Sequence, residues 1–263
     1  MIRSAGLAAL ALALAGNAAA QEPLPSCATE LVVLDASETS AIAVLDRAAG
    51  ARYLFDQIVP ADDQAGLDGV FLTHAHDGRP LGLDGFARGA AGVPVFVMPR
   101  MAQFLTANAS WSELVEQGSV AFVPLEDNVL MPVSDTFGVW PIAVPQRGDG
   151  AETVGFLIMT PGKRALYLPD LAGWGDMEAV DNQALSDLLD MVDIALVDAR
   201  VATKSTLDGR YMLAAVHSRG EVEVRFIHYD LADPLHDPAS PESARAAANG
   251  FGVARAGDRM CLD

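Results

Sequence analysis

The sequence predicts an α/β protein, a four-layer αββα sandwich in which two mixed β-sheets pack face to face between flanking helices. Consecutive strand-like segments dominate the first part of the chain, and farther on single helices alternate with single strands. Apolar residues make up 51% of the 263 residues, which is enough for one substantial core. We therefore expect a single domain.

Short apolar runs rich in β-branched and aromatic residues predict the strands. They lie at residues 31–34, 41–45, 52–58, 69–72, 93–98, 120–124, 139–144, 155–159, 165–168, 194–197, 224–228 and 251–254. Pro161, Gly162 and Lys163 separate two of these runs and have the composition of a hairpin turn. We expect the strands on either side of this turn to pair with each other.

Helical periodicity predicts four helices between the strands, at residues 101–107, 112–116, 182–191 and 241–248. Ser240 stands directly before the last of them, where a serine side chain can cap the first turn.

The first twenty residues have the pattern of a cleavable secretory signal. Arg3 precedes an apolar run at 5–15, and Ala18, Ala19 and Ala20 provide a small-residue cleavage site before Gln21. The apolar run is shorter than the roughly 20 residues that a membrane span needs. We expect residues 1–20 to be removed and residues 21–263 to form a periplasmic or secreted domain without a membrane span.

Cys27 and Cys261 are the two cysteines of the chain. In an oxidising compartment they are expected to pair, and the long loop that they close would stabilise the fold by roughly 4 to 5 kcal/mol in the chain-entropy model. The alternative is two unpaired thiols near the ends of the chain.

Acidic residues far outnumber basic ones, and the formal net charge is −18. A surface of this sign repels phosphate backbones, so nucleic acid is excluded as an expected partner. The oligomeric state is not predicted by the sequence.

The segment at 72–82, LTHAHDGRPLG, carries the chemistry-bearing pattern of the chain. His74 and His76 follow the apolar run at 69–72 and are separated by one residue. In an extended loop, this spacing points both side chains the same way, so both imidazoles can reach one metal ion.

A strand that ends in this pair resembles the metallo-β-lactamase superfamily, whose motif is His-x-His-x-Asp-His. Further stretches in matching order are similar to the branch that contains coenzyme PQQ synthesis protein B and its secreted relatives. They lie at 93–101, 144–147, 152–155, 168–170, 196–199, 227–228 and 233–242. The resemblance covers about 31–260, and it implies the metallo-β-lactamase fold and an ancestral chemistry of hydrolysis by metal-activated water.

Four residues match the ligands that this resemblance implies: His74, His76, Asp170 and His228. Three positions depart from the pattern, where Gly78, Arg79 and Gln146 stand in place of an Asp and two His. A guanidinium offers only donors and cannot ligate a cation. We expect one zinc or iron ion at most, or none, with Asp77 as a substitute carboxylate for the missing one.

Each of these residues also has a structural interpretation. His74 and His76 would be hydrogen-bonded loop residues, Asp170 a cap of the next segment, and His228 a core histidine. Three others are open in the same way: Asp198 would orient a histidine or begin a turn, His217 would line the pocket, and His236 is expected to be exposed.

Arg79, Arg100 and Arg147 follow strands whose ends, in the resembled fold, approach the mouth of the site. Guanidinium groups bind carboxylates in bidentate fashion, so these arginines, with Gln146, predict a pocket for a small anionic ligand. The alternative is three unrelated surface arginines. The resulting first hypothesis is a mononuclear metal-dependent hydrolase in which Asp170, Arg79 and Arg147 are catalytic. The alternative is a non-catalytic binding protein for PQQ or a related polycarboxylate, and a third is an interaction module. Whether the protein is an enzyme stays open.

Overall fold

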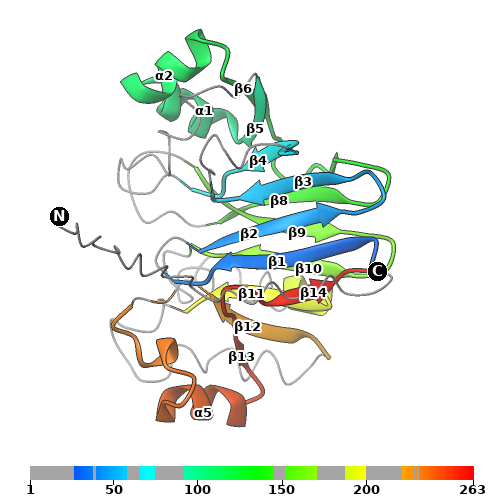
Figure 1. Ribbon diagram of the computed structural model, residues 1–263, viewed down its shortest axis with the longest axis vertical. Coiled ribbons are helices and arrows are strands. Elements are labelled where there is room, and N and C mark those ends of the chain that lie inside the picture. The colour runs from blue at the N-terminus through cyan, green and yellow to red at the C-terminus, as the bar shows by residue number, and fades with distance from the viewer. Residues whose placement is uncertain are drawn as a thin grey trace, which may run out of the picture.

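Two seven-stranded β-sheets form the centre of the protein in the computed structural model (Figure 1). The structure describes residues 27–37, 40–57, 66–74, 92–144, 152–170, 187–199, 221–227, 229 and 231–263. Within these ranges, no helix has the length and apolar character needed to cross a membrane.

The first sheet has the strand order β14-β1-β2-β3-β4-β5-β6. The pairs β14–β1, β1–β2 and β2–β3 are antiparallel, whereas the pairs β3–β4, β4–β5 and β5–β6 are parallel. Their bounds are β1 Thr29–Asp35, β2 Ala41–Asp46, β3 Ala51–Phe55, β4 Gly69–Phe71, β5 Val93–Val97, β6 Val120–Pro124 and β14 Arg259–Cys261.

The second sheet repeats this arrangement in the order β13-β12-β11-β10-β9-β8-β7. Strands β7 to β10 are antiparallel, and β10 to β13 are parallel. Their bounds are β7 Met131–Pro132, β8 Gly138–Val144, β9 Thr153–Met159, β10 Arg164–Leu168, β11 Ile194–Asp198, β12 Glu223–Ile227 and β13 Gly252–Val253. In each sheet the carboxyl ends of the parallel strands therefore lie at the same end of the sheet.

Short helices flank the sheets at the two ends of the long axis (Figure 1). Helices α1 (Pro99–Thr106) and α2 (Ala109–Glu116) lie near β6, where Trp111 of α2 packs 5.8 Å from Phe122. Helix α5 (Pro241–Ala248) lies beside β13 at the other end, after the 3-10 turn η4 (Pro234–His236). The side chain of Ser240 caps α5 by accepting a hydrogen bond from the Ser243 N–H, as the sequence predicts.

Aromatic side chains from both sheets fill the space between them. Phe55 of β3 stacks on Phe71 of β4 with ring centroids 4.8 Å apart, and Phe156 of β9 meets both rings edge-on at 5.6 Å. Tyr167 of β10 lies 6.0 Å from Phe55. All four side chains are fully buried, so this cluster is the centre of the core.

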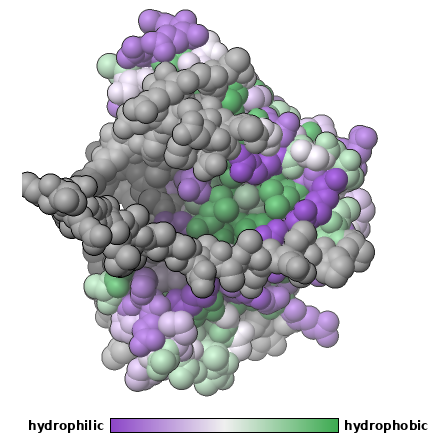
Figure 2. Space-filling model, viewed as in Figure 1, coloured by the Kyte–Doolittle hydropathy of each residue, from purple (hydrophilic) through white to green (hydrophobic). Residues whose placement is uncertain are grey.

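Strand β2 of the first sheet is buried on both faces. Every residue of β2 except Leu45 is buried, although alternate residues point to opposite faces. Figure 2 shows apolar side chains gathered over the middle of the face in view, where β2 and β3 run, with polar side chains around them. This burial is typical of sheets covered on both faces, as in a four-layer sandwich.

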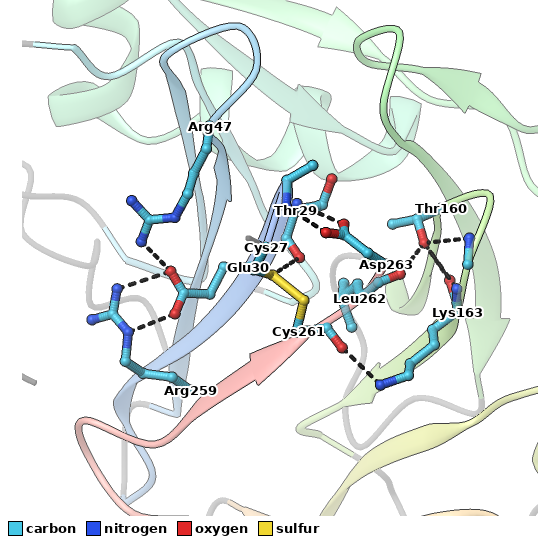
Figure 3. The surroundings of a disulfide bond; sticks show 12 residues. Cys27, Thr29, Glu30, Arg47, Thr160, Lys163, Arg259, Cys261, Leu262 and Asp263 are labelled. Atoms are coloured by element: carbon cyan, nitrogen blue, oxygen red, sulfur yellow. Dashed lines mark hydrogen bonds and ion pairs between the residues drawn. A yellow bond between two sulfur atoms is a disulfide. The ribbon is translucent and has the colours of Figure 1, made fainter. Parts of the chain in front are cut away.

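The predicted disulfide between Cys27 and Cys261 is present, with the two Cα atoms 5.8 Å apart (Figure 3). Around it, the segment 259–263 contacts both sheets. Its Leu262 N–H donates to the carbonyl oxygen of Thr29, the first residue of β1, while its own carbonyl oxygen accepts from the backbone N–H of Lys163 in the β9–β10 turn. The Lys163 ammonium donates to the Cys261 carbonyl at 3.0 Å. We call this set, residues 27–29, 160–163 and 259–263, the clasp.

Glu30 lies next to the clasp and is completely buried. Arg259 binds its carboxylate in bidentate fashion, with N···O distances of 2.6 and 2.9 Å, and Arg47 forms a second ion pair with it. The hydrogen bonds from Arg259 come first among the causes that lower the pKa of Glu30. The ion pairs therefore compensate for burying this charge.

The predicted fold class is confirmed, since the two mixed sheets and flanking helices are those of the αββα sandwich. The hairpin at Pro161, Gly162 and Lys163 is confirmed by the antiparallel pairing of β9 with β10. Of the helix expected at 182–191, residues 187–190 are helical and the earlier residues lie outside the described ranges.

Candidate metal centre

Three predicted site residues that the structure describes lie at or just after the carboxyl ends of parallel strands. His74 comes three residues after β4, Asp170 two residues after β10, and Asp198 is the last residue of β11. Two hydrogen bonds connect the sheets at this end: Val154 N–H donates to the Thr73 carbonyl at 2.8 Å, and the Tyr167 hydroxyl donates to the Ser40 carbonyl at 2.5 Å. The ends of β4 and β10 therefore lie on the same side of the molecule.

His74 is buried, with 5% of its surface exposed. Its Nδ1 lies 2.7 Å from the hydroxyl oxygen of Thr73, which is itself completely buried. A hydrogen bond at one ring nitrogen fixes the orientation of an imidazole and leaves its other nitrogen to act as a ligand.

Asp56 follows β3 and binds Thr73 through two hydrogen bonds. Its carboxylate accepts from the Thr73 N–H at 2.8 Å and from the Thr73 hydroxyl at 2.5 Å. The residue has a backbone φ of 55°, a left-handed conformation that an Asp tolerates better than most residues. Asp56, Thr73 and His74 therefore form one buried hydrogen-bonded chain.

Burial raises the pKa of Asp56 to about 7, and the negative charge of Asp170 contributes to the rise, whereas the hydrogen bonds from Thr73 oppose it. Asp170 lies two residues after β10, whose carboxyl end is on the same side of the molecule as the end of β4 that leads to His74. Asp170 is itself buried, with 9% of its surface exposed. An imidazole and a buried carboxylate thus come to the same end from different sheets.

Asp198 is completely buried at the end of β11, beside β10. A fully buried carboxylate must have polar partners, so Asp198 is a fixed part of the interior rather than a solvent-exposed turn residue. His236 is exposed on η4, as expected.

Arg100 lies in the first turn of α1 and is exposed. The backbone N–H groups of Arg100 and Met101 donate to the Glu152 carboxylate at 2.7 and 3.2 Å. Met98, at the N-cap position, provides no side-chain cap, so Glu152 provides the acceptor that the helix start needs. This bond holds the start of α1 beside the residue that precedes β9.

The other predicted site residues lie outside the described ranges: His76, Asp77, Gly78, Arg79, Gln146, Arg147, His217 and His228. Within the described ranges, one group of three metal-type side chains lies close together, formed by Cys27, Cys261 and Asp263. Its cysteines are joined in the disulfide, so it is part of the clasp rather than a metal site.

Sequence reasoning missed Asp56, Thr73, Tyr167 and Glu152. The one available signal was Asp56 itself, a carboxylate within the apolar run at 52–58. An acidic residue in such a run indicates a specific buried partner.

The family model described as "Beta-lactamase superfamily domain" matches residues 32–236. The chain belongs to this superfamily. None of the curated proteins matches the sequence. The match includes Asp56, His74, Asp170 and Asp198.

Solved structures with the same fold include Zn²⁺-bound PqqB from Methylobacterium extorquens. It has a TM-score of 0.66 at 18% identity, over 89% of this chain and 100% of that one. A diphosphatase from the PhnP family has a TM-score of 0.62, also at 18% identity, over 89% and 100% of the two chains. CmlA, a diiron β-hydroxylase from Streptomyces venezuelae, reaches 0.51 at 16% identity, over 92% and 55%. At these identities the likeness shows the metallo-β-lactamase fold, in which proteins that use metal ions occur.

Proposed function

We propose that this protein is an exported, mononuclear metal-dependent hydrolase that acts on a small anionic molecule. The observation that carries the proposal is the buried chain from Asp56 through Thr73 to His74, with the Asp170 carboxylate at the same end. A histidine held in this way is typical of metal ligands, whose outer partners fix the ring.

The residues fit a metal ion by their donor chemistry. Imidazole nitrogens and a carboxylate are ligands that zinc and iron accept, and we assign His74, His76 and Asp170 to the ion, with His228 beside the second position of the family pattern. When bound, the ion would supply Lewis acidity and lower the pKa of a water molecule. Burial of His74 and Asp170 keeps bulk water away from this end of the site.

The arginines supply the recognition of the substrate in this proposal. Arg79 and Arg147 hold an anionic group of the substrate and stabilise the negative charge that develops on it, and Arg100 and Gln146 contribute to binding. Arg79 stands at the place of a family ligand, so its charge replaces that of a second ion.

Elemental analysis of the purified protein tests the proposal. We expect about one equivalent of zinc or iron, lost in His74→Ala and His76→Ala but retained in His236→Ala, which removes an exposed histidine. Protein that holds no metal after expression with both metals supplied would contradict the hydrolase.

The second candidate is a non-catalytic binding protein for PQQ or a related polycarboxylate. The arginine at position 79 favours it, since this residue removes a ligand and adds a carboxylate-binding group. Calorimetric titration of metal-free protein with PQQ decides: heat of binding that is lost in Arg79→Ala supports the binding protein, and no heat with no thermal shift contradicts it.

Export belongs to the same proposal and is supported by the disulfide, because such bonds persist in oxidising compartments. We expect the mature protein to begin at Gln21, which N-terminal sequencing of the periplasmic or secreted fraction would establish.

A further inference from the structure

The direction of the hydrogen bonds that connect Asp56 to His74 through the Thr73 hydroxyl follows from the chemistry of these groups. A threonine hydroxyl has one proton, so it can donate one hydrogen bond. When Asp56 is ionised, above its pKa of about 7, the Thr73 hydroxyl donates to Oδ2 of Asp56 at 2.5 Å, and it therefore offers a lone pair to Nδ1 of His74 at 2.7 Å. Nδ1 must then carry the proton of the neutral ring.

A neutral imidazole has one N–H group, so a protonated Nδ1 leaves the lone pair on Nε2. We propose that Asp56 and Thr73 are positioning residues that hold His74 in its Nδ1–H tautomer and thereby present Nε2 as the metal ligand. The step from tautomer to metal affinity rests on the proposed function, whereas the tautomer itself does not.

The support is rigid enough for this role. Asp56 also accepts from the Thr73 backbone N–H through its other oxygen, at 2.8 Å, so its carboxylate cannot rotate without losing one of two bonds. The carbonyl of Thr73 accepts from Val154 of the second sheet. The exposed fractions of Asp56, Thr73 and His74 are 1%, 0% and 5%, which leaves little room for water to replace any of these bonds.

Asp56→Asn inverts the chain of hydrogen bonds and is the decisive variant. The amide oxygen still accepts from the Thr73 N–H, but the amide nitrogen now donates to the Thr73 hydroxyl, which must turn its proton towards Nδ1. His74 then takes the Nε2–H tautomer. Both hydrogen bonds with Thr73 are kept and Asn tolerates the left-handed backbone, so the variant is expected to fold.

The measurement is the ¹⁵N and ¹H spectrum of the histidine rings in metal-free protein at about pH 8.5, above both the pKa of about 7 of Asp56 and the ordinary pKa of imidazole. We expect a protonated Nδ1 on His74 in the unsubstituted protein and a protonated Nε2 in Asp56→Asn. A residue with a purely structural role would not change the tautomer. An unprotonated Nδ1 in the unsubstituted protein, or the same tautomer in both proteins, would overturn the proposal.

Substitution of Thr73 provides an independent test. Thr73→Val removes the hydroxyl at nearly constant volume and should weaken zinc binding about 10- to 100-fold, while Thr73→Ser should restore most of the affinity. Thr160→Val is the matched control, since it removes a hydrogen-bonded hydroxyl from the clasp, at the end of the strands away from His74. Equal loss of zinc affinity in Thr73→Val and Thr160→Val, or no rescue by serine, would contradict the positioning role.

The failure of this inference differs from the failure of the proposed function. Protein that binds no zinc but shows the Nδ1–H tautomer would contradict the hydrolase and leave the positioning residues in place. Protein that binds zinc while His74 carries its proton on Nε2 in the metal-free state would do the reverse.

Discussion

Asp56 is a buried acid whose ionisation opposes folding. Burial and the nearby Asp170 charge raise its pKa from 3.8 to about 7. The folded protein therefore keeps a proton on Asp56 at pH values where the unfolded chain has lost it. The same network affects Tyr167, whose pKa burial and the Asp56 charge raise well above its usual range.

The first prediction concerns the pH dependence of stability in metal-free protein. The folded pKa exceeds the unfolded value, so the contribution of Asp56 is fully present below about pH 3.8 and is lost as pH rises through about 7. At 1.36 kcal/mol per pKa unit, the loss is on the order of 4 kcal/mol. Denaturant unfolding from pH 4 to 8 should show that Asp56→Asn removes this loss. Parallel curves for the two proteins would refute it.

At the scale of secondary-structure elements, α1 depends on a carboxylate from a distant part of the chain. Glu152 lies 52 residues from Arg100 in sequence and accepts from the first turn of the helix. A negative charge at this position also interacts favourably with the helix dipole. Glu152 therefore links the start of α1, which follows β5 of the first sheet, to the start of β9 of the second sheet.

The second prediction is that Glu152→Ala lowers the free energy of unfolding by about 1 kcal/mol, because two backbone N–H groups lose their acceptor. Glu152→Gln should retain most of it through the amide oxygen. Glu116→Ala, an exposed residue at the end of α2, is the control and should change stability by less than about 0.5 kcal/mol. If the two alanine variants have equal effects in denaturant titrations, the cap contributes nothing.

The elements that sequence reasoning found are those with their own apolar pattern. Among the residues that the structure describes, the two strands it missed are short, Met131–Pro132 and Arg259–Cys261, and each pairs with a longer neighbour. Arg259 pairs with Val32 of β1 in this ladder, and its side chain binds Glu30, which is 229 residues away in sequence. The bonds from Asp56 to Thr73 likewise join residues 17 apart, and no local pattern predicts them.

On the scale of the whole molecule, hydrogen bonds connect the two sheets at both ends of their strands. Near the candidate metal centre, Val154 binds Thr73 and Tyr167 binds Ser40. At the other end of the strands, the clasp joins β1 to the β9–β10 turn. Gly162 allows the close approach there, because a Cβ atom at this position would lie 2.1 Å from the backbone of Asp263. His74 and Asp170, from different sheets, therefore keep their relative positions.

The third prediction concerns the disulfide. Replacing both cysteines, Cys27→Ala with Cys261→Ala, should lower the free energy of unfolding by up to about 5 kcal/mol, because the bond closes a loop of more than two hundred residues. The double substitution should leave the tautomer of His74 unchanged, since the clasp lies at the end of the strands away from His74. Thiol titration of unfolded protein without reductant checks the bond, and two reactive thiols would contradict it.

The clasp also has a consequence for the order of folding. Strand β1 pairs with β14, so a chain synthesised only as far as α5 has one edge of its first sheet unpaired. Contacts of such long sequence separation form slowly, because a large loop must close before they stabilise anything. During that interval the open edge can pair with another chain. Newly made protein should therefore be most prone to aggregation just before β14 has docked on β1.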